Sequence, residues 1–305
     1  LVEKLKTLIS IHTENPPGNV RGVAEALRDF GVKTSAEMEF QTVEEGKDNA
    51  LLSYSFGQGK TLVFNTHMDV NNPNGQAWEF NPYDPFEKDG KVFGLGACDA
   101  KGSLAAMLQA IQRVCQNPEG VRGTLLLTAV MGEEAGGIGS LYLVTHKNLR
   151  AEGAVVGEPS MLVPCCAHKG TYMRRLTFHG KAVHSASSHL GINAVEHACI
   201  FCVRYRELQQ RLKADAHPRL GYANASVTLM EGGTRQNTIP ETCRVLIDRR
   251  LLPGETKEKA QEEVGCILEG ISRELPDLQR VDIEEVVSTV PSQTDEDEEI
   301  VKLAV

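Results

Sequence analysis

The sequence predicts an α/β protein: a mostly parallel sheet flanked by helices, followed by a second layer of α+β character. In the first half, segments with helical spacing of apolar residues alternate with short apolar strands, as in a parallel sheet covered by helices. Thr124–Met131 is almost entirely apolar, which is typical of a strand buried on both faces. After Gly170 the strands instead alternate apolar and polar residues, as half-exposed strands do.

The elements of the first half follow from these periodicities in chain order. Leu1, Leu5, Leu8 and Ile9 share one face of a helix, and Asn15-Pro16-Pro17-Gly18 stops it. Gly57-Gln58-Gly59 is a turn between two strands. The further expected elements are a helix at 23–30, strands at 51–56 and 61–65, an irregular excursion at 70–90, a helix at 101–116, a helix at 140–146 and a short buried strand at 153–156.

The sequence pattern of the second half predicts fewer helices and more half-exposed strands. We expect strands at 172–180, 225–229, 243–248 and 281–289, and helices at 193–212 and 255–275. The chain then returns to a helix at 295–305, whose acidic first turn, Asp295–Glu299, is a solvated surface favoured by the helix dipole.

Composition excludes several classes of protein. The 32 Lys and Arg residues against 41 Asp and Glu residues give a net charge of −9, which disfavours nucleic acid as a partner. No apolar run approaches the ~18 residues that a membrane span requires. Eight cysteines in 305 residues do not form a disulfide scaffold, so we expect a reducing, cytoplasmic setting.

Four acidic or imidazole clusters stand just after the buried strands. They are His67-Met68-Asp69, Asp99, Glu133-Glu134 and Glu158. Ligands of open α/β sheets gather outside the carboxyl ends of the strands, so we expect these loops to converge.

These residue types suit a metal-dependent hydrolase. Asp69 faces the same way as His67 and can accept the second imidazole N–H. Asp99 could bridge two ions ~3.5–4 Å apart, and the adjacent Glu133 and Glu134 divide naturally into a general base and a metal ligand. Oxygen and nitrogen ligands without thiolate suit zinc, cobalt or manganese.

Each cluster also has an ordinary structural interpretation. A lone His-x-Asp is usually a surface or capping pair, and paired acids often open a helix. Gly94-Leu95-Gly96 resembles the start of a dinucleotide fingerprint, but Asp99 occupies the third glycine position and would repel a pyrophosphate. No Gly-x-Ser-x-Gly elbow supports a serine hydrolase.

Taken in order, these segments resemble the motifs of the co-catalytic zinc deacylases and exopeptidases over essentially the whole chain. The matching segments are Thr66–Val70, Gly94–Gly102, Gly132–Glu134 and Gly157–Pro159. The resemblance implies a zinc-exopeptidase-like fold in which His67 and Glu158 hold one metal, Glu134 helps to hold the other and Asp99 bridges. It also implies that Asp69 orients His67, that Glu133 is the general base and that the Asp99–Ala100 peptide is cis.

The acetylornithine deacetylase branch of this family is the most similar. Ala167–Gly170, Gly180–Ser185, Gly191–Ala194 and Asp248–Gly254 carry that likeness. It implies a catalytic domain at 1–171, an inserted lid and dimerisation domain at 172–285, and a return to the catalytic domain at 286–305. His184 would polarise the scissile carbonyl of the partner subunit's substrate, and Asn237 and Arg250 would hold the substrate carboxylate. A surface ion pair is the competing interpretation of Arg250.

The implied reaction is hydrolysis of an N-acyl amino acid amide, above all N2-acetylornithine, by a homodimer that holds two divalent metal ions. Zinc is the expected metal, with cobalt or manganese as alternatives. A dipeptidase or carboxypeptidase, an N-succinyl-diaminopimelate desuccinylase and a non-catalytic metal-binding protein are the competing functions. The family's last metal ligand is a histidine near the end of the catalytic domain, whereas the last histidine here is His217, so we expect the chain to be truncated.

Overall fold

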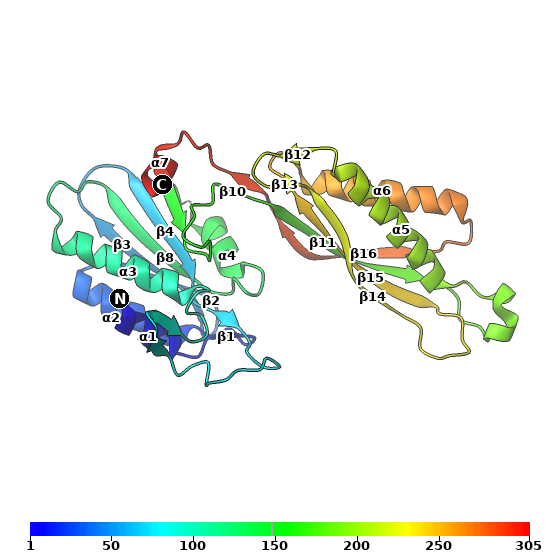
Figure 1. Ribbon diagram of the computed structural model, residues 1–305, viewed down its shortest axis with the longest axis horizontal. Helices are drawn as coiled ribbons and strands as arrows, with labels where there is room; N and C mark the ends of the chain where they lie inside the picture. The colour runs from blue at the N-terminus through cyan, green and yellow to red at the C-terminus, as the bar shows by residue number, and fades with distance from the viewer. Residues whose placement is uncertain (148) are drawn as a thin grey trace. The chain divides into compact units, whose positions relative to one another are not determined.

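The computed structural model describes residues 1–147 and 149–305. The chain divides into two compact units, Leu1–Val163 and Pro164–Val305 (Figure 1). Each unit has its own sheet and its own buried core.

The first unit is built on a five-stranded mixed sheet. The strands are ordered β2 (Glu37–Glu44), β3 (Lys47–Ser55), β8 (Thr124–Val130), β4 (Thr61–His67) and β9 (Gly153–Val156). β4 is parallel to both β8 and β9, whereas β3 is antiparallel to both β2 and β8. β3 alone therefore runs against the other four strands of this sheet, which agrees with the expected α/β class.

Helices cover both faces of this sheet. On one face, α1 (Val2–Ile9), α2 (Arg21–Thr34) and α3 (Lys101–Gln116) bury the larger core, to which β3 contributes Leu52. The neighbouring Leu51 points to the other face, where it packs with Leu143 of α4 (Ile138–His146). The alternation along β3 thus separates two hydrophobic clusters.

The expected turn at Gly57-Gln58-Gly59 joins two strands that are not neighbours. β8 lies between β3 and β4 in the sheet, so the short connection does not form a hairpin. β2 was not predicted, although its half-buried Met38 and Phe40 alternate with exposed Glu37 and Glu39 and pack against the larger core. Short pairs complete the unit: β1 (Glu14–Asn15) with β5 (Val70–Asn71), and β6 (Phe86–Lys88) with β7 (Lys91–Phe93).

The second unit is a four-stranded antiparallel sheet with two helices. Its strands are ordered β14 (Asn224–Gly232), β15 (Thr242–Leu251), β11 (Gly170–His179) and β16 (Val281–Thr289). α5 (Ala194–Leu212) and α6 (Lys257–Glu274) pack on one face and complete its core. This is the α+β layer that the alternating strands predict.

The remaining elements of the second unit are short. They are β10 (Ala167–His168) paired with β17 (Ser292–Gln293), β12 (Ala216–His217) paired with β13 (Gly221–Tyr222), the 3-10 helix η1 (Ser185–Leu190) and α7 (Glu299–Ala304). The prediction of a helix from Asp295 is wrong at its start. The Asp295 carboxylate accepts the backbone N–H of Asp297, which favours a local turn, and the helix begins only at Glu299.

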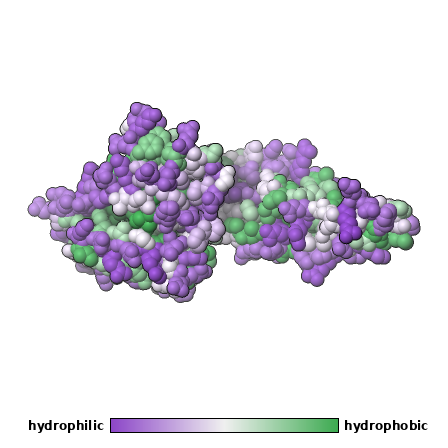
Figure 2. Space-filling view, turned by 90° about the horizontal axis from the view of Figure 1, so that it is seen from below, coloured by the Kyte–Doolittle hydropathy of each residue, from purple (hydrophilic) through white to green (hydrophobic). Residues whose placement is uncertain are grey.

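The surface of the second unit is not uniformly hydrophilic. Apolar patches interrupt the hydrophilic surface of the second unit (Figure 2). Exposed apolar side chains there include Leu229 and Met230 on the edge strand β14.

Among the described residues, none of the helices is both long and apolar enough to span a bilayer.

Candidate metal centre and active site

His67 is the last residue of β4, and its imidazole is buried at the carboxyl end of the sheet. Nδ1 lies 2.9 Å from the backbone carbonyl oxygen of Asp69 and 3.6 Å from the nearer carboxylate oxygen. Nε2 points the other way, 2.9 Å from Asp99 Oδ1 and 3.8 Å from Glu158 Oε1. The backbone carbonyl is therefore the nearer acceptor for Nδ1–H, which leaves Nε2 facing the carboxylates.

The Asp69 carboxylate is fully buried and accepts three hydrogen bonds. Oδ1 accepts the backbone N–H of Glu133 at 3.2 Å, and Oδ2 accepts that of Glu134 at 3.2 Å. Asn15 Nδ2 donates to Oδ2 at 2.9 Å. Both oxygens are thus committed to holding the turn that carries the two glutamates.

Asp99 and Glu158 reach His67 from two other loops. Asp99 stands two residues before α3, and the Asp99–Ala100 peptide is cis, which confirms the prediction made from the resemblance. Glu158 follows β9 by two residues, with Gly157 N–H bonded to the Asn65 carbonyl of β4 at 2.8 Å. One ligand atom from each of His67, Asp99 and Glu158 lies within 4.8 Å of the others.

Glu134 and Glu133 stand beside this group without joining it. Glu134 is not part of the three-residue cluster that the described residues form, and its Oε2 accepts a hydrogen bond from Asn71 Nδ2 at 2.6 Å. Glu133 is exposed to solvent, as a group that exchanges protons with water should be.

The electrostatics of the site call for a cation. Burial disfavours the charged form of His67, but the surrounding carboxylates outweigh it and raise the pKa of His67 to about 9. Burial and the Glu133 and Asp99 carboxylates raise the pKa of Glu158 to about 7, despite its attraction to His67. Burial and the same two carboxylates also raise the pKa of Glu134. Like charges gathered this closely are stabilised by a bound divalent ion.

The donor set fits such an ion. An imidazole nitrogen and carboxylate oxygens are ligands of zinc, which binds them at about 2.0–2.2 Å and hence holds neighbouring donors roughly 3.3–3.5 Å apart. The Nε2 distances of 2.9 and 3.8 Å to Asp99 and Glu158 bracket that separation. His67, Asp99 and Glu158 are therefore the candidate metal ligands of this unit.

Three residues beside the site were not singled out from the sequence: Asn15, Asn71 and Lys101. Lys101 is fully buried, and its Nζ donates to the Ile11 carbonyl at 2.7 Å. Burial lowers the pKa of Lys101 to about 8, although Glu14 and Asp69 act in the opposite direction. Asn15 lies in Asn-Pro-Pro-Gly and Lys101 in Asp-Ala-Lys-Gly, but neither segment shows which carbonyl or carboxylate the fold places beside it.

The predicted residues of the second unit fall into two places. His184 caps η1, and its Nε2 lies 3.4 Å from Asn237 Nδ2. Arg250 instead pairs with Asp248 at 3.0 Å and donates to Thr171 Oγ1 at 2.9 Å. β15 begins at Thr242, near the His184 end, and the eight residues from there to Arg250 span about 26 Å of extended strand. The second unit thus brings His184 and Asn237 together and keeps Arg250 apart.

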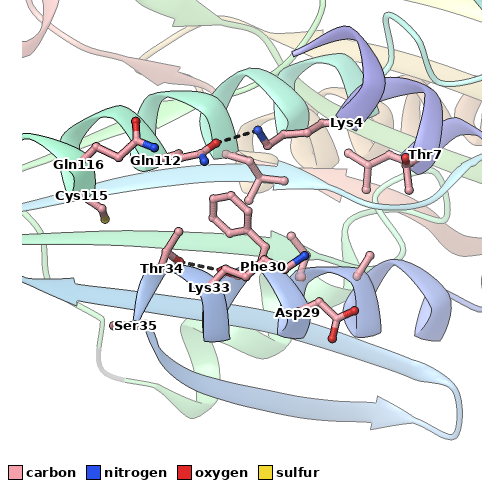
Figure 3. A pocket seen from close by; sticks show the side chains of 14 residues that line it. Lys4, Thr7, Asp29, Phe30, Lys33, Thr34, Ser35, Gln112, Cys115 and Gln116 are labelled. Atoms are coloured by element: carbon pink, nitrogen blue, oxygen red, sulfur yellow. Dashed lines mark hydrogen bonds between the residues drawn. The ribbon is translucent and has the colours of Figure 1, made fainter.

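A pocket of about 650 Å³ lies between α1, α2 and α3 (Figure 3). Phe30 and Lys33 of α2 face Gln112 and Cys115 of α3 across it, and Lys4 Nζ is already bonded to Gln112 at 2.8 Å. The α3 residues that line it come from the second half of the helix, and Lys101 and Gln112 are about 16 Å apart along the helix axis. The pocket therefore belongs to the far end of α3 from the candidate ligands.

Comparison with known proteins decides the family. Residues 63–305 match the profile of peptidase family M20/M25/M40. The chain belongs to this family. It is thus a member of a metallohydrolase family, and the convergence of His67, Asp99 and Glu158 lies within the matched region.

The relatives with known names include deacylases. Acetylornithine deacetylase of Vibrio parahaemolyticus is 29% identical over 95% of this chain and 76% of the relative. The acetylornithine deacetylase of Vibrio vulnificus is 32% identical over 80% of this chain and 65% of the relative. A probable succinyl-diaminopimelate desuccinylase of Staphylococcus epidermidis is 28% identical over 83% and 68%. The matched regions thus span between 65% and 76% of the length of these relatives.

Solved structures of the M20 family share the fold. Aminopeptidase PepT of Bacillus cereus aligns with a TM-score of 0.80 at 20% identity, covering 99% of this chain and 79% of its own. A dinuclear metal-binding peptidase of the M20 family from Bacillus subtilis aligns with a TM-score of 0.65 at 15% identity, covering 96% and 75%. At these identities the likeness establishes the fold.

Proposed function

We propose that this M20 protein hydrolyses the amide bond of N-acyl amino acids, with N2-acetylornithine as its principal substrate and ornithine and acetate as products. The observation that carries the proposal is the meeting of His67, Asp99 and Glu158 beside the glutamate turn held by Asp69. The acetylornithine deacetylases among its relatives support the choice of substrate.

Two divalent metal ions are part of this proposal, with zinc as the expected metal and cobalt or manganese as alternatives. His67 and Glu158 would hold one ion, Glu134 would help to hold the second, and Asp99 would bridge them. The dinuclear metal-binding M20 peptidase of Bacillus subtilis supports the proposal that two metal ions are bound. When bound, the metals would polarise the acyl carbonyl and lower the pKa of water.

Glu133 is the proposed general base. Its side chain is exposed, while its backbone is fixed by Asp69, so a carboxylate is presented to solvent from a rigid turn. It accepts a proton from the attacking water and returns that proton to the leaving amine. One residue thereby serves as base and then as acid, and Asp69 fixes where it stands.

His184 and Asn237 are proposed to act on the substrate of a partner subunit. They lie together on exposed loops of the second unit, so they form one candidate binding group. Arg250 lies about 26 Å along β15 from Thr242, the end of the strand nearer to Asn237, so we propose that Asn237 and Arg250 of one subunit do not contact the same small substrate. A homodimer built through the second unit would let the two groups come from different subunits, and the edge strand β14 offers exposed Leu229 and Met230 for it.

The compartment belongs to the proposal as well. Cys98, Cys199 and Cys266 are exposed thiols outside any disulfide, which suits a protein kept in the reducing cytoplasm. Exposed thiols such as Cys98 and Cys199 would oxidise in a secreted protein.

A substrate panel tests the reaction. The metal-loaded protein would be assayed with N2-acetylornithine, N-succinyl-diaminopimelate and a dipeptide, beside Glu133→Gln as the inactive control. We expect kcat/KM for N2-acetylornithine to exceed the others by at least about tenfold. A preference for the succinyl compound or the dipeptide would assign the chain to those activities. Metal binding without turnover of any of the three would favour a non-catalytic role.

A further inference from the structure

The segment Ile11–Asn15 runs alongside the metal centre and is attached to it at several points. Lys101 Nζ donates to the Ile11 carbonyl at 2.7 Å. Thr13 Oγ1 donates to the Met68 carbonyl at 2.9 Å, and the Thr13 carbonyl accepts Val70 N–H at 3.1 Å. These contacts secure the segment to both sides of Asp69 in the chain.

Asn15 makes the contact that reaches the site itself. A buried carboxylate can only accept, so the group 2.9 Å from Asp69 Oδ2 must be the amide N–H of Asn15. Gly18 leaves the room for this amide, because a Cβ at Gly18 would lie 3.0 Å from Asn15 Cγ and Nδ2. Gly18 also has a φ of +76°, which other residues rarely adopt.

We propose that Asn15 is a positioning residue of the metal centre: it orients the Asp69 carboxylate, which in turn sets the Glu133–Glu134 turn. Lys101 supports the same arrangement by fixing Ile11 at the start of the segment. The proposal assigns the Asn-Pro-Pro-Gly segment a place in the active site, and its activity readout rests on the proposed hydrolase.

The geometry explains why this donor matters. Asp69 must direct one oxygen to each of two successive backbone N–H groups, which fixes the plane of its carboxylate. Asn15, which precedes Asp69 by 54 residues in the chain, donates to one of those oxygens, Oδ2. Without it, Oδ2 keeps only the 3.2 Å bond to Glu134 N–H, and the carboxylate gains freedom to turn.

Asn15→Leu and Asn15→Asp test the proposal, since the first removes the amide and the second keeps its size without the N–H donor. Co²⁺ affinity of the 305-residue chain is the first readout, measured by titration calorimetry and by the visible absorption of the bound ion. We expect both variants to bind Co²⁺ about 10–100-fold more weakly, as loss of an orienting partner does in metal sites. For turnover, we expect kcat to fall more than KM changes, because a misplaced base affects the chemical step.

Tyr54→Phe is the matched control. Its hydroxyl contacts Thr34 Oγ1 at 2.9 Å in the core of the same unit, away from the ligands, so the variant loses a polar contact without touching Asp69. Its Co²⁺ affinity should equal that of the unmodified chain. Gly18→Ala provides an independent perturbation, and by displacing the Asn15 amide it should weaken Co²⁺ binding in the same direction.

The outcomes separate the alternatives. Unchanged Co²⁺ affinity in folded Asn15→Leu or Asn15→Asp overturns the proposal, as does an equal loss in Tyr54→Phe or an unmodified chain that binds no Co²⁺. If Asn15→Leu does not fold, Asn15→Asp and Gly18→Ala decide the question. A chain that binds Co²⁺ but turns over no amide would refute the proposed function while leaving the Asn15 affinity test intact.

Discussion

The Nδ1 atom of His67 lies 2.9 Å from the backbone carbonyl of Asp69 and 3.6 Å from its carboxylate. A backbone carbonyl can only accept a hydrogen bond, so it favours the tautomer that carries its proton on Nδ1 and presents Nε2 to a metal. The Asp69 carboxylate is then free to bind the Glu133 and Glu134 N–H groups. Asp69 thus orients His67 through its backbone carbonyl and holds the backbone of Glu133 through its carboxylate.

Asp69→Asn tests this division. The carbonyl remains, so the Nδ1–H resonance of His67 in the metal-loaded protein should persist in a nitrogen–proton NMR spectrum. The amide can accept at only one end, so the Glu133–Glu134 turn loses a partner. We expect kcat to fall about 100-fold or more. Loss of the His67 resonance would instead show that the carboxylate sets the tautomer.

Glu133→Gln and Glu134→Gln should differ in kind. The first keeps the shape and removes the proton acceptor, so we expect kcat to fall about 10²–10⁴-fold with metal content unchanged. The second removes a charged ligand, so metal content measured by atomic emission should fall. Equal metal depletion in both variants would contradict the assigned roles.

Mixing two inactive variants tests whether His184 acts across the dimer. A dimer of Glu133→Gln with His184→Ala would contain one site with both defects and one site with neither. Random subunit exchange should therefore restore about a quarter of the unmodified activity. Exchange confirmed by mass spectrometry without any recovery would show that His184 does not serve the neighbouring site.

Stability of the second unit should depend on the buried Arg249. Glu255 bonds its guanidinium at 2.6 Å, and Glu263 bonds it at 3.0 Å. Glu255→Gln leaves that charge poorly paired and should cost about 2–3 kcal/mol of unfolding free energy near neutral pH, measured by urea denaturation. Glu274→Gln, which affects the exposed pair with Arg204, should change stability little.

The same pair predicts a pH dependence with a definite sign. Burial opposes ionisation of Glu255, but Arg249 outweighs it and holds the pKa of Glu255 below its usual range. The stabilisation is complete above the unfolded-state pKa of about 4.3 and is lost as the pH falls through the lower folded value. The difference in stability between the unmodified chain and Glu255→Gln should therefore shrink below about pH 4. A difference that stays constant down to pH 3 would contradict this origin.

Much of the fold was readable from apolar periodicity. Helix 101–116 and strands 153–156 and 281–289 have the predicted bounds, and the helix buries a regular apolar face. The prediction that 153–156 is a buried strand is wrong, because Val155 and Val156 are exposed. β2 was missed although Met38 and Phe40 alternate with glutamates along it. The place of β8 between β3 and β4 was not expected, because strand order depends on contacts distant in sequence.

Some residues of the site could be predicted from the sequence and others could not. His67, Asp99 and Glu158 could be anticipated, since their residue types name their chemistry and strand ends converge in such sheets. Asn15 and Lys101 could not, because their roles depend on which carbonyl or carboxylate the fold places beside them. The same holds for Arg250, whose partners Asp248 and Thr171 only the fold reveals.

Metal-dependent release of ornithine from N2-acetylornithine tests the central claim most directly. It would be measured on the purified protein before chelation, after removal of the metal, and after Zn²⁺ or Co²⁺ is restored, with Glu133→Gln in parallel. We predict release that disappears with the metal, returns with it and is absent in Glu133→Gln at every stage. Release that continues in the metal-free protein, or that persists in Glu133→Gln, would contradict the account.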